Sequence, residues 1–173
     1  MNGKIVGGVI LVAAAIAGLA LYYLQVYGYY HEVDAPDEGV LLVSINSNTS
    51  EPILTDNFRA IDADSSPIRY RACFETSLSL AMLTETYVVS DEMTPRNAPG
   101  WFHCFDAKAI AAEIEEGTAL TFLGQKNINY GVDRIVAITS DGRGYVWHEL
   151  NDCGDKSYDG TVVGEACPER PAD

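Results

Sequence analysis

The side chains with the greatest capacity for catalysis in this sequence are two histidines and two arginines: His103, His148, Arg69 and Arg71. Histidine exchanges a proton near neutral pH, and planar guanidinium groups can bind a carboxylate or a phosphate. All four would have to converge in one cleft to form an enzyme site, which is one hypothesis. The alternation of His148 with apolar neighbours predicts instead a histidine satisfied within a sheet. We expect the two arginines to pair with acidic side chains.

Cysteine chemistry is the next candidate, because the chain contains four cysteines: Cys73, Cys104, Cys153 and Cys167. An even number in an exported protein predicts two disulfides. Three pairings are possible. We favour Cys73 with Cys104 and Cys153 with Cys167, since the second pair encloses a turn-rich tail that has little else to order it. Zinc sites usually hold paired cysteines about two to four residues apart, which is not the spacing here, and a catalytic thiol would have to be free. No metal or other cofactor is predicted.

Familiar catalytic and nucleotide-binding motifs are absent from the sequence, including G-x-G-x-x-G, G-x-S-x-G and H-E-x-x-H. Residues 62–66 resemble the first half of a calcium loop, but Pro67 stands where that loop needs glycine, and the glutamate at its end is missing. The sequence therefore predicts a non-catalytic protein with no catalytic, cofactor-binding or metal-binding residues.

The composition is strongly acidic, with 11 Lys and Arg against 25 Asp and Glu and a net charge of −14 over 173 residues. Nucleic-acid binding needs clustered basic side chains to neutralise phosphates, so nucleic acid is excluded as a partner. The length suits a membrane anchor followed by one domain.

A long apolar segment near the amino terminus supplies that anchor. The run Ile5–Leu24 has no charged or strongly polar side chain, and its 20 residues, at about 1.5 Å each, match a bilayer core of about 30 Å. A cleaved signal peptide is the alternative, but its apolar core is usually only about 7 to 15 residues long. Lys4 precedes the run, whereas residues 28–58 contain no Lys or Arg. This asymmetry predicts a cytoplasmic amino end and a translocated body.

Two groups of residues within residues 1–30 suggest how the anchor sits. Small residues with the spacing that lets transmembrane helices approach closely form a helix-packing face: Gly3, Gly7, Ala14 and Gly18. Tyrosines at the outer end form an interfacial aromatic belt at headgroup level: Tyr22, Tyr23, Tyr27, Tyr29 and Tyr30. The predicted partners are therefore the lipid bilayer and transmembrane subunits of a larger complex.

The body is predicted to be an α+β domain at residues 39–173, after an acidic linker at 31–38. Apolar or alternating segments predict a mainly antiparallel sheet with strands at 40–45, 68–74, 118–123, 132–139 and 145–150. The pair Asp141-Gly142 predicts a hairpin between the last two strands. Asp106 predicts the cap of one short helix at 107–116, and residues 78–83 fit either a helix capped by Ser77 or a strand.

Three segments carry a resemblance to a known group: the opening MNGKIVGGVILVAAAIAGLALYYLQVY, then APGWFHCFDA and DRIVAITSDGRGYVWHEL. They resemble an uncharacterised family of small, single-span, membrane-anchored periplasmic proteins of Rhodobacter-like alphaproteobacteria. The resemblance extends over nearly the whole chain. It implies a location in the bacterial inner membrane with a periplasmic domain and no known activity, and it supplies no functional residues.

Two non-catalytic functions therefore compete with the enzyme hypothesis. The first is an accessory or assembly subunit of an inner-membrane complex, such as a respiratory complex. The second is an acidic, membrane-tethered docking module for a basic periplasmic partner such as a c-type cytochrome, because charge near a membrane raises the local concentration of an oppositely charged protein.

Overall fold

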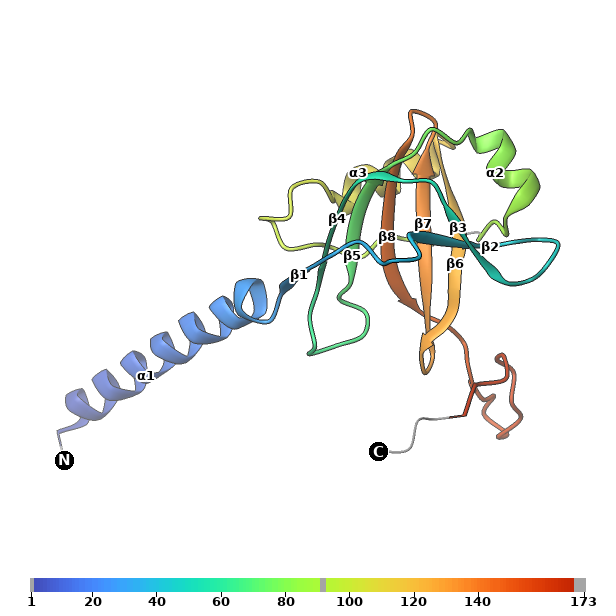
Figure 1. The fold of residues 1–173 in the computed structure, drawn as a ribbon. Helices are drawn as coiled ribbons and strands as arrows, with labels where there is room; N and C mark the ends of the chain where they lie inside the picture. Colours follow the sequence, from blue (N-terminus) through green and yellow to red (C-terminus); the bar gives the residue numbers. More distant parts are fainter. Residues whose placement is uncertain (1, 91–92, 170–173) are drawn as a thin grey trace.

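A computed structural model of the protein describes residues 2–90 and 93–169, and shows a long helix projecting from a sheet domain (Figure 1). The helix α1 covers Gly3–Tyr23 and continues as a π-helical turn, η1, over Leu24–Gly28. Asn2 caps its start by accepting a hydrogen bond from the Lys4 amide at 3.2 Å. The combined helix is long and apolar enough to cross a bilayer, and none of its most apolar stretch is buried within the protein. The predicted apolar helix is confirmed.

The body contains an antiparallel six-stranded sheet in the order β1-β4-β5-β8-β7-β6. Its strands are β1 His31–Val33, β4 Asp56–Asp62, β5 Arg71–Glu75, β6 Ala119–Asn129, β7 Val132–Thr139 and β8 Arg143–Leu150. The predicted hairpin between β7 and β8 is present, and Gly142 adopts a φ of 88°, a conformation that favours glycine.

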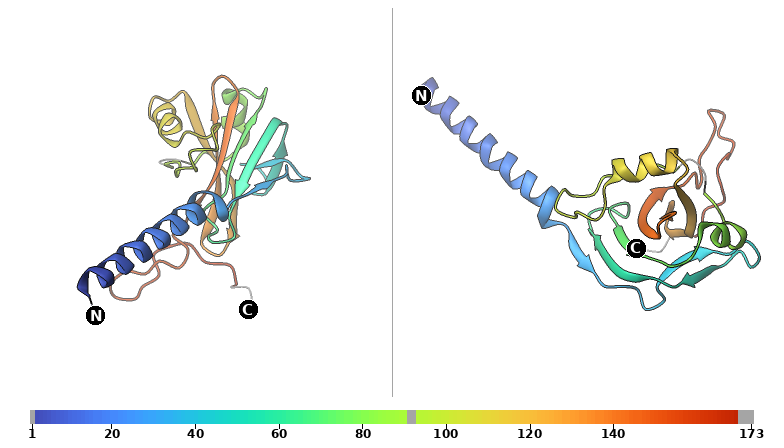
Figure 2. Two further views of the ribbon diagram at one scale, coloured as in Figure 1. Left: turned by 90° about the vertical axis from the view of Figure 1, so that its left-hand side faces the viewer. Right: turned by 90° about the horizontal axis from the view of Figure 1, so that it is seen from above.

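A small second sheet pairs β2 Val40–Val43 with β3 Ser50–Ile53 and joins the main sheet through the segment that follows α2, Leu80–Thr86. The Val88 amide donates to the Val43 carbonyl at 2.8 Å, and the Leu123 amide donates to the Val88 carbonyl at 2.9 Å. Residue 88 thus connects β2 to β6. Helix α3, Ala107–Glu115, and the β2–β3 pair lie on opposite sides of the sheet (Figure 2).

The core accordingly has two halves, one on each face of the sheet. One half gathers Leu42, Phe74, Leu83, Phe122 and Val146 beneath β2, β3 and α2. The other half packs its side chains under α3 and the preceding loop, and includes Ile61, Phe105, Ile110, Ile135 and Trp147. Burial on both faces explains why residues 135–138 are apolar throughout, and the predicted α+β class is confirmed.

Several local predictions need correction. Residues 80–83 lie in a second helix of the domain, α2, whose N-cap is Ser79 rather than Ser77, and residue 78 precedes the cap. The strand predicted at 68–74 begins only at Arg71, because residues 66–69 form a turn. Strands β3 and β4 were not predicted, since polar side chains on their exposed faces interrupt the apolar pattern. The predicted linker at 31–38 includes β1, which pairs with β4 at the sheet edge.

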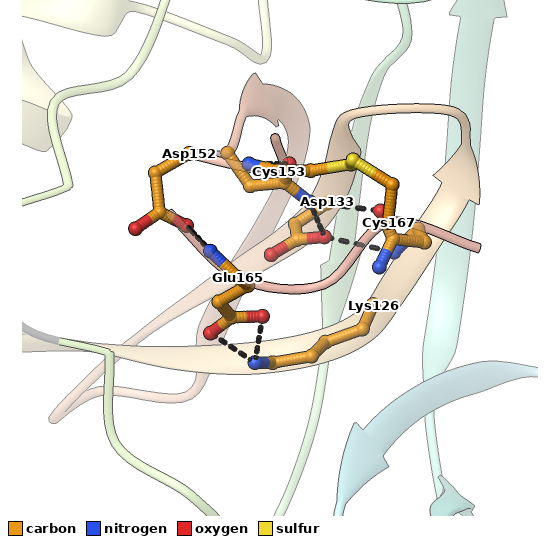
Figure 3. The surroundings of a disulfide bond; sticks show 8 residues. Lys126, Asp133, Asp152, Cys153, Glu165 and Cys167 are labelled. Atoms are coloured by element: carbon orange, nitrogen blue, oxygen red, sulfur yellow. Dashed lines mark hydrogen bonds and ion pairs between the residues drawn. A yellow bond between two sulfur atoms is a disulfide. The ribbon is translucent and has the colours of Figure 1, made fainter. Parts of the chain in front are cut away.

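Both disulfides have the favoured pairing, Cys73 with Cys104 and Cys153 with Cys167. The second disulfide encloses an irregular carboxyl-terminal segment beside β6 and β7. Figure 3 shows Lys126 reaching the carboxylate of Glu165 close to this bond, with Nζ–Oε1 at 2.6 Å.

Candidate functional site at the junction of helix and domain

The carboxyl end of the apolar helix is joined directly to the domain by a side chain from a distant loop. Helix ends leave backbone carbonyls without intrahelical partners, and a π-helical turn shifts which carbonyls these are. In η1 the Tyr29 amide donates to the Leu24 carbonyl at 3.0 Å. The Val26 carbonyl instead accepts a hydrogen bond from the indole Nε1 of Trp101 at 2.7 Å. The loop before α3 therefore caps the end of the helix.

Aromatic packing reinforces this hydrogen bond. The Trp101 ring stacks on Tyr27 with centroids 6.4 Å apart, and it meets the edge of Tyr30 at 6.1 Å. Tyr23 stacks on Tyr27 in turn, at 6.0 Å. Aromatic pairs at such separations contribute about 0.5 to 1.5 kcal/mol each beyond the area that they bury. Part of the predicted tyrosine belt thus serves as the contact surface between helix and domain.

Arg69 provides a second contact, from the turn between β4 and β5. Its Nη2 donates to Oε1 of Gln25 at 2.6 Å, and its guanidinium lies over the Tyr30 ring, 5.7 Å from the centroid. Neither α1 nor η1 has a basic residue in its last turn. Because the carboxyl end of a helix carries a partial negative charge, a cation at this position is stabilising.

The loop that carries Trp101 is itself held to the sheet by a buried arginine. Arg71 lies on β5 and is only 4% exposed. Its guanidinium donates to the carbonyls of Arg96 at 2.9 Å and Asn97 at 3.1 Å in the loop, and to those of Ile68 and Tyr70 beside it. Burial lowers the pKa of Arg71 to about 10. The group stays charged at neutral pH and fixes the loop through main-chain atoms.

Two further links hold the same loop. Arg96 forms an ion pair with Glu149 at the end of β8, and both Nε–carboxylate distances are close to 3 Å, at 3.1 and 3.0 Å. The disulfide from Cys104 attaches the far end of the loop to Cys73 on β5. The loop at residues 96–104 is therefore anchored at both ends and presents Trp101 to the helix.

A cavity of about 470 Å³ lies at this junction, between the helix end and the loop. It is lined by Tyr22, Gln25 and Tyr30 from the helix side and by Arg69 and Asn97 from the domain. We call the contacts of Trp101 and Arg69 with residues 22–30, together with this cavity, the junction site.

His148 occupies a separate, buried position on β8. Its ring stacks on Tyr70 at 4.6 Å, its Nδ1 lies 2.7 Å from the Pro67 carbonyl, and its Nε2 accepts from Nε of Arg134 at 3.2 Å. Burial lowers the pKa of His148 to about 4, and the positive charges of Arg134 and Arg71 add to this effect. The predicted role of His148 as a satisfied sheet residue matches these contacts.

The four residues first considered for catalysis do not share a cleft. Arg71 packs with Phe105 on the α3 side of the sheet, while His148 stacks on Tyr70 on the other side. His103 is exposed and lines a different cavity, near the start of α3, and Arg69 lies at the junction site. The expected pairing of the two arginines with acids is wrong: within residues 2–90 and 93–169, neither has a carboxylate within 4.0 Å.

The residues of the predicted helix-packing face are exposed on α1. Gly3, Gly7 and Gly18 are exposed, and a Cβ added at any of them would meet no atom within 4 Å, so this face of the helix is open. Ala14 is likewise exposed. In the part of the chain that the structure describes, no three His, Cys, Asp or Glu side chains are grouped as metal ligands.

Sequence analysis missed the main residues of the junction site, which are Trp101, Gln25 and the loop at 96–100. The available signal was weak: one amide side chain interrupts an otherwise apolar run, and one tryptophan follows a Pro-Gly turn. Nothing in the spacing predicts that residues 75 positions apart, Val26 and Trp101, are hydrogen-bonded.

Comparison with known proteins places the domain in a family without assigning a function. No curated protein and no solved structure matches the chain. Residues 40–168, which include all but β1 of the sheets and both disulfides, match a family of unknown function, DUF6446. The protein therefore belongs to the uncharacterised family DUF6446.

Proposed function

We propose that this protein is a non-catalytic accessory or assembly subunit of a bacterial inner-membrane complex, such as a respiratory complex. In this proposal α1 spans the membrane with its amino end in the cytoplasm, and the domain lies in the periplasm. The charge asymmetry around Lys4 and the two disulfides, which form in oxidising compartments, support this placement.

The observation that carries the proposal is the junction site. A protein that needs only to be kept near a membrane can use a flexible linker, because a tether restricts distance and not orientation. Here the Trp101 hydrogen bond, the Arg69 hydrogen bond and the stacked rings hold the domain against the end of the helix. A fixed height and orientation above the membrane are useful to a subunit that contacts a membrane partner through both helix and domain.

The exposed small residues of α1 offer a surface for such a partner. Gly7 and Gly18 leave open space along the helix, and helices in lipid associate by close packing because burial of apolar surface gives no driving force there. Gly7→Leu should therefore weaken association with a transmembrane partner. Gly8→Leu is the matched control, since it adds the same bulk at an equally open position about 100° around the helix.

Purification of the native complex tests the proposal. The full chain with a carboxyl-terminal tag, extracted from its own membrane in mild detergent, should copurify with other membrane proteins in fixed proportion. Trp101→Ala should reduce their recovery, while Tyr158→Ala, which removes a fully exposed aromatic ring from the tail, should not. Recovery of the wild-type chain alone would contradict the proposal.

A second candidate is docking of a basic periplasmic partner such as a c-type cytochrome. It is favoured by the shortage of internal charge pairing: in the described residues only Glu113, Asp141, Glu149 and Glu165 form ion pairs. The remaining carboxylates leave a strongly negative domain. Binding of a basic cytochrome to the full chain in nanodiscs should then weaken as salt rises, because the Debye length falls from about 10 Å at 0.1 M to about 3 Å at 1 M. Association that is absent or independent of salt would contradict this candidate.

A further inference from the structure

We infer that the junction site binds the phosphate of an anionic phospholipid headgroup, with Arg69 as its cation. The inference rests on the membrane anchoring in the proposed function, but it does not depend on any protein partner. It assigns a ligand to the cavity formed by the end of the helix, the turn before β5 and the loop before Trp101.

The length of the apolar run places Arg69 at the level of the lipid headgroups. The apolar run Ile5–Leu24 has 20 residues, and at about 1.5 Å per residue it extends over the full bilayer core of about 30 Å. Gln25, the next residue, is therefore at the level where headgroups begin. Arg69 is hydrogen-bonded to Gln25, so its guanidinium lies at the same level. The cavity beside it includes Tyr22, on the last turns of the apolar helix, and faces the headgroup layer.

The positive charge of Arg69 is available to bind an anion. The protein carries 25 acidic side chains, yet among residues 2–90 and 93–169 none places a carboxylate within 4.0 Å of Arg69. A guanidinium has five N–H donors in a planar fork that suits phosphate oxygens, and Gln25 accepts from Nη2. The Tyr30 ring beneath the guanidinium holds its orientation. The remaining donors can bind a phosphodiester in the cavity.

Three other arginines near the sheet are less suited than Arg69 to bind a lipid phosphate. Arg71 is buried, and four main-chain carbonyls occupy its guanidinium. Arg134 is placed over the Tyr70 ring and donates to His148. Arg59 is exposed and, in the described residues, also without a carboxylate within 4.0 Å, but it lines another cavity beside the disulfide at Cys73. Arg69 alone among these four contacts the end of the membrane helix.

A lipid phosphate is favoured over soluble phosphate because the bilayer holds lipid headgroups close to the cavity. The net charge of −14 repels dissolved anions from the domain, whereas lipid headgroups are held beside the cavity by the bilayer. One basic side chain close to an anionic surface typically strengthens association by about fivefold. Loss of the Arg69 charge should therefore weaken retention of an anionic lipid by about the same factor.

Native mass spectrometry of the full chain released from detergent micelles tests the inference. With phosphatidylglycerol added, the wild-type chain should retain one lipid more strongly than with phosphatidylcholine. Arg69→Gln should reduce retention of phosphatidylglycerol about fivefold, and Arg69→Lys should restore part of it. Arg59→Gln, which removes the same charge elsewhere, should leave retention unchanged. Equal thermal unfolding of the variants confirms that each is folded.

Two results would overturn the inference. One is equal retention of phosphatidylglycerol by the wild-type, Arg69→Gln and Arg59→Gln chains. The other is binding of millimolar inorganic phosphate to the lipid-free protein, abolished by Arg69→Gln, without any preference for the anionic lipid; this would assign the site to a soluble anion. Neither result depends on a copurifying protein, so this test can fail while the proposed accessory function holds.

Discussion

Two segments of this protein are each closed by a disulfide, but they differ in how firmly they are attached to the sheet. Cys73–Cys104 closes a loop with a sequence separation of 31, and Cys153–Cys167 closes one with a separation of 14. Loop-closure entropy assigns these crosslinks similar contributions, about 4 and about 3 kcal/mol. The first attaches a loop to the central sheet, whereas the second joins two points of the same tail.

The surroundings of the two disulfides account for the difference. The first segment is held by Arg71, by the Arg96–Glu149 ion pair and by the stacking of Trp101 on the membrane helix. The second has one exposed ion pair to Lys126 and leaves Tyr158 and Val163 in solvent, at 101% and 65% exposure. A disulfide restricts the conformations of a segment. The buried contacts of that segment decide how strongly loss of the disulfide lowers the stability of the sheet.

Removal of the first disulfide should have the largest effect. Replacing Cys73 and Cys104 together by Ala frees the loop and leaves a small void beside buried Cys73, so the free energy of unfolding should fall by about 4 kcal/mol. Denaturant unfolding of the full chain, monitored by the fluorescence of buried Trp147, measures it. A loss below about 1 kcal/mol would mean that the other contacts of the loop suffice.

Acid should weaken the domain through His148. Its folded pKa of about 4 lies below the ordinary value of 6.5, so between these values the unfolded chain binds a proton that the folded one excludes. The stabilising contribution of neutral His148 is therefore fully present above pH 6.5. It is lost as the pH drops toward 4, which lowers the free energy of unfolding by up to about 3 kcal/mol. The contact between β7 and β8 at Arg134 should loosen first, because a protonated Nε2 can no longer accept the hydrogen bond from Arg134, whereas Nδ1 can still donate to the Pro67 carbonyl.

Two histidine variants separate this effect from general acid unfolding. His148→Phe should flatten the dependence of unfolding free energy on pH in this range, whereas His103→Gln, at an exposed position, should retain it. The same slope in His148→Phe as in the wild type would assign the acid sensitivity to other groups.

Trp101→Ala should have an intermediate and local effect. It removes a hydrogen bond of about 1 kcal/mol and a stacked pair of similar size, so docking of the domain on the helix should weaken by about 2 kcal/mol. Hydrogen exchange of the Tyr29 and Tyr30 amides should accelerate by about thirtyfold at that energy. Trp101→Phe keeps a ring without the N–H and should give roughly half the energetic effect. Unchanged exchange in both variants would show that this contact does not hold the junction.

Removal of the second disulfide should change global stability little. Cys153→Ala with Cys167→Ala should lower the unfolding free energy of the sheet by less than about 1 kcal/mol, because few buried groups connect the tail to the core. Limited proteolysis should nonetheless cleave residues 154–166 much faster. A loss as large as that of the first pair would remove the contrast between the segments.

The smallest effect is expected for the tail ion pair. Lys126→Ala removes the contact with Glu165, in which both side chains are about half exposed, at 47% and 48%. Exposed pairs contribute about 0 to 1 kcal/mol, and salt screens them. The midpoint of thermal unfolding should shift by no more than about 4 °C.

The parts of the fold that the sequence predicted are those set by local pattern. The apolar helix, β7 with its two buried faces, the Asp141-Gly142 hairpin and the helix after Asp106 each follow from neighbouring residues. The edge strand β1 and its neighbour β4 were missed, because polar side chains interrupt their apolar pattern and their pairing is decided by the rest of the sheet. The junction site was missed for a related reason: Arg69 resembles half of an arginine pair in sequence, and only the folded chain places it beside Gln25.

The junction site fixes the domain to the end of the apolar helix. Distances between spin labels at Gly8→Cys on the helix and Glu115→Cys at the end of α3 test this in the full chain in nanodiscs. The wild type should give one narrow distance distribution, and Trp101→Ala combined with Arg69→Gln should broaden it. A wild-type distribution as broad as that of the double variant would contradict a fixed junction.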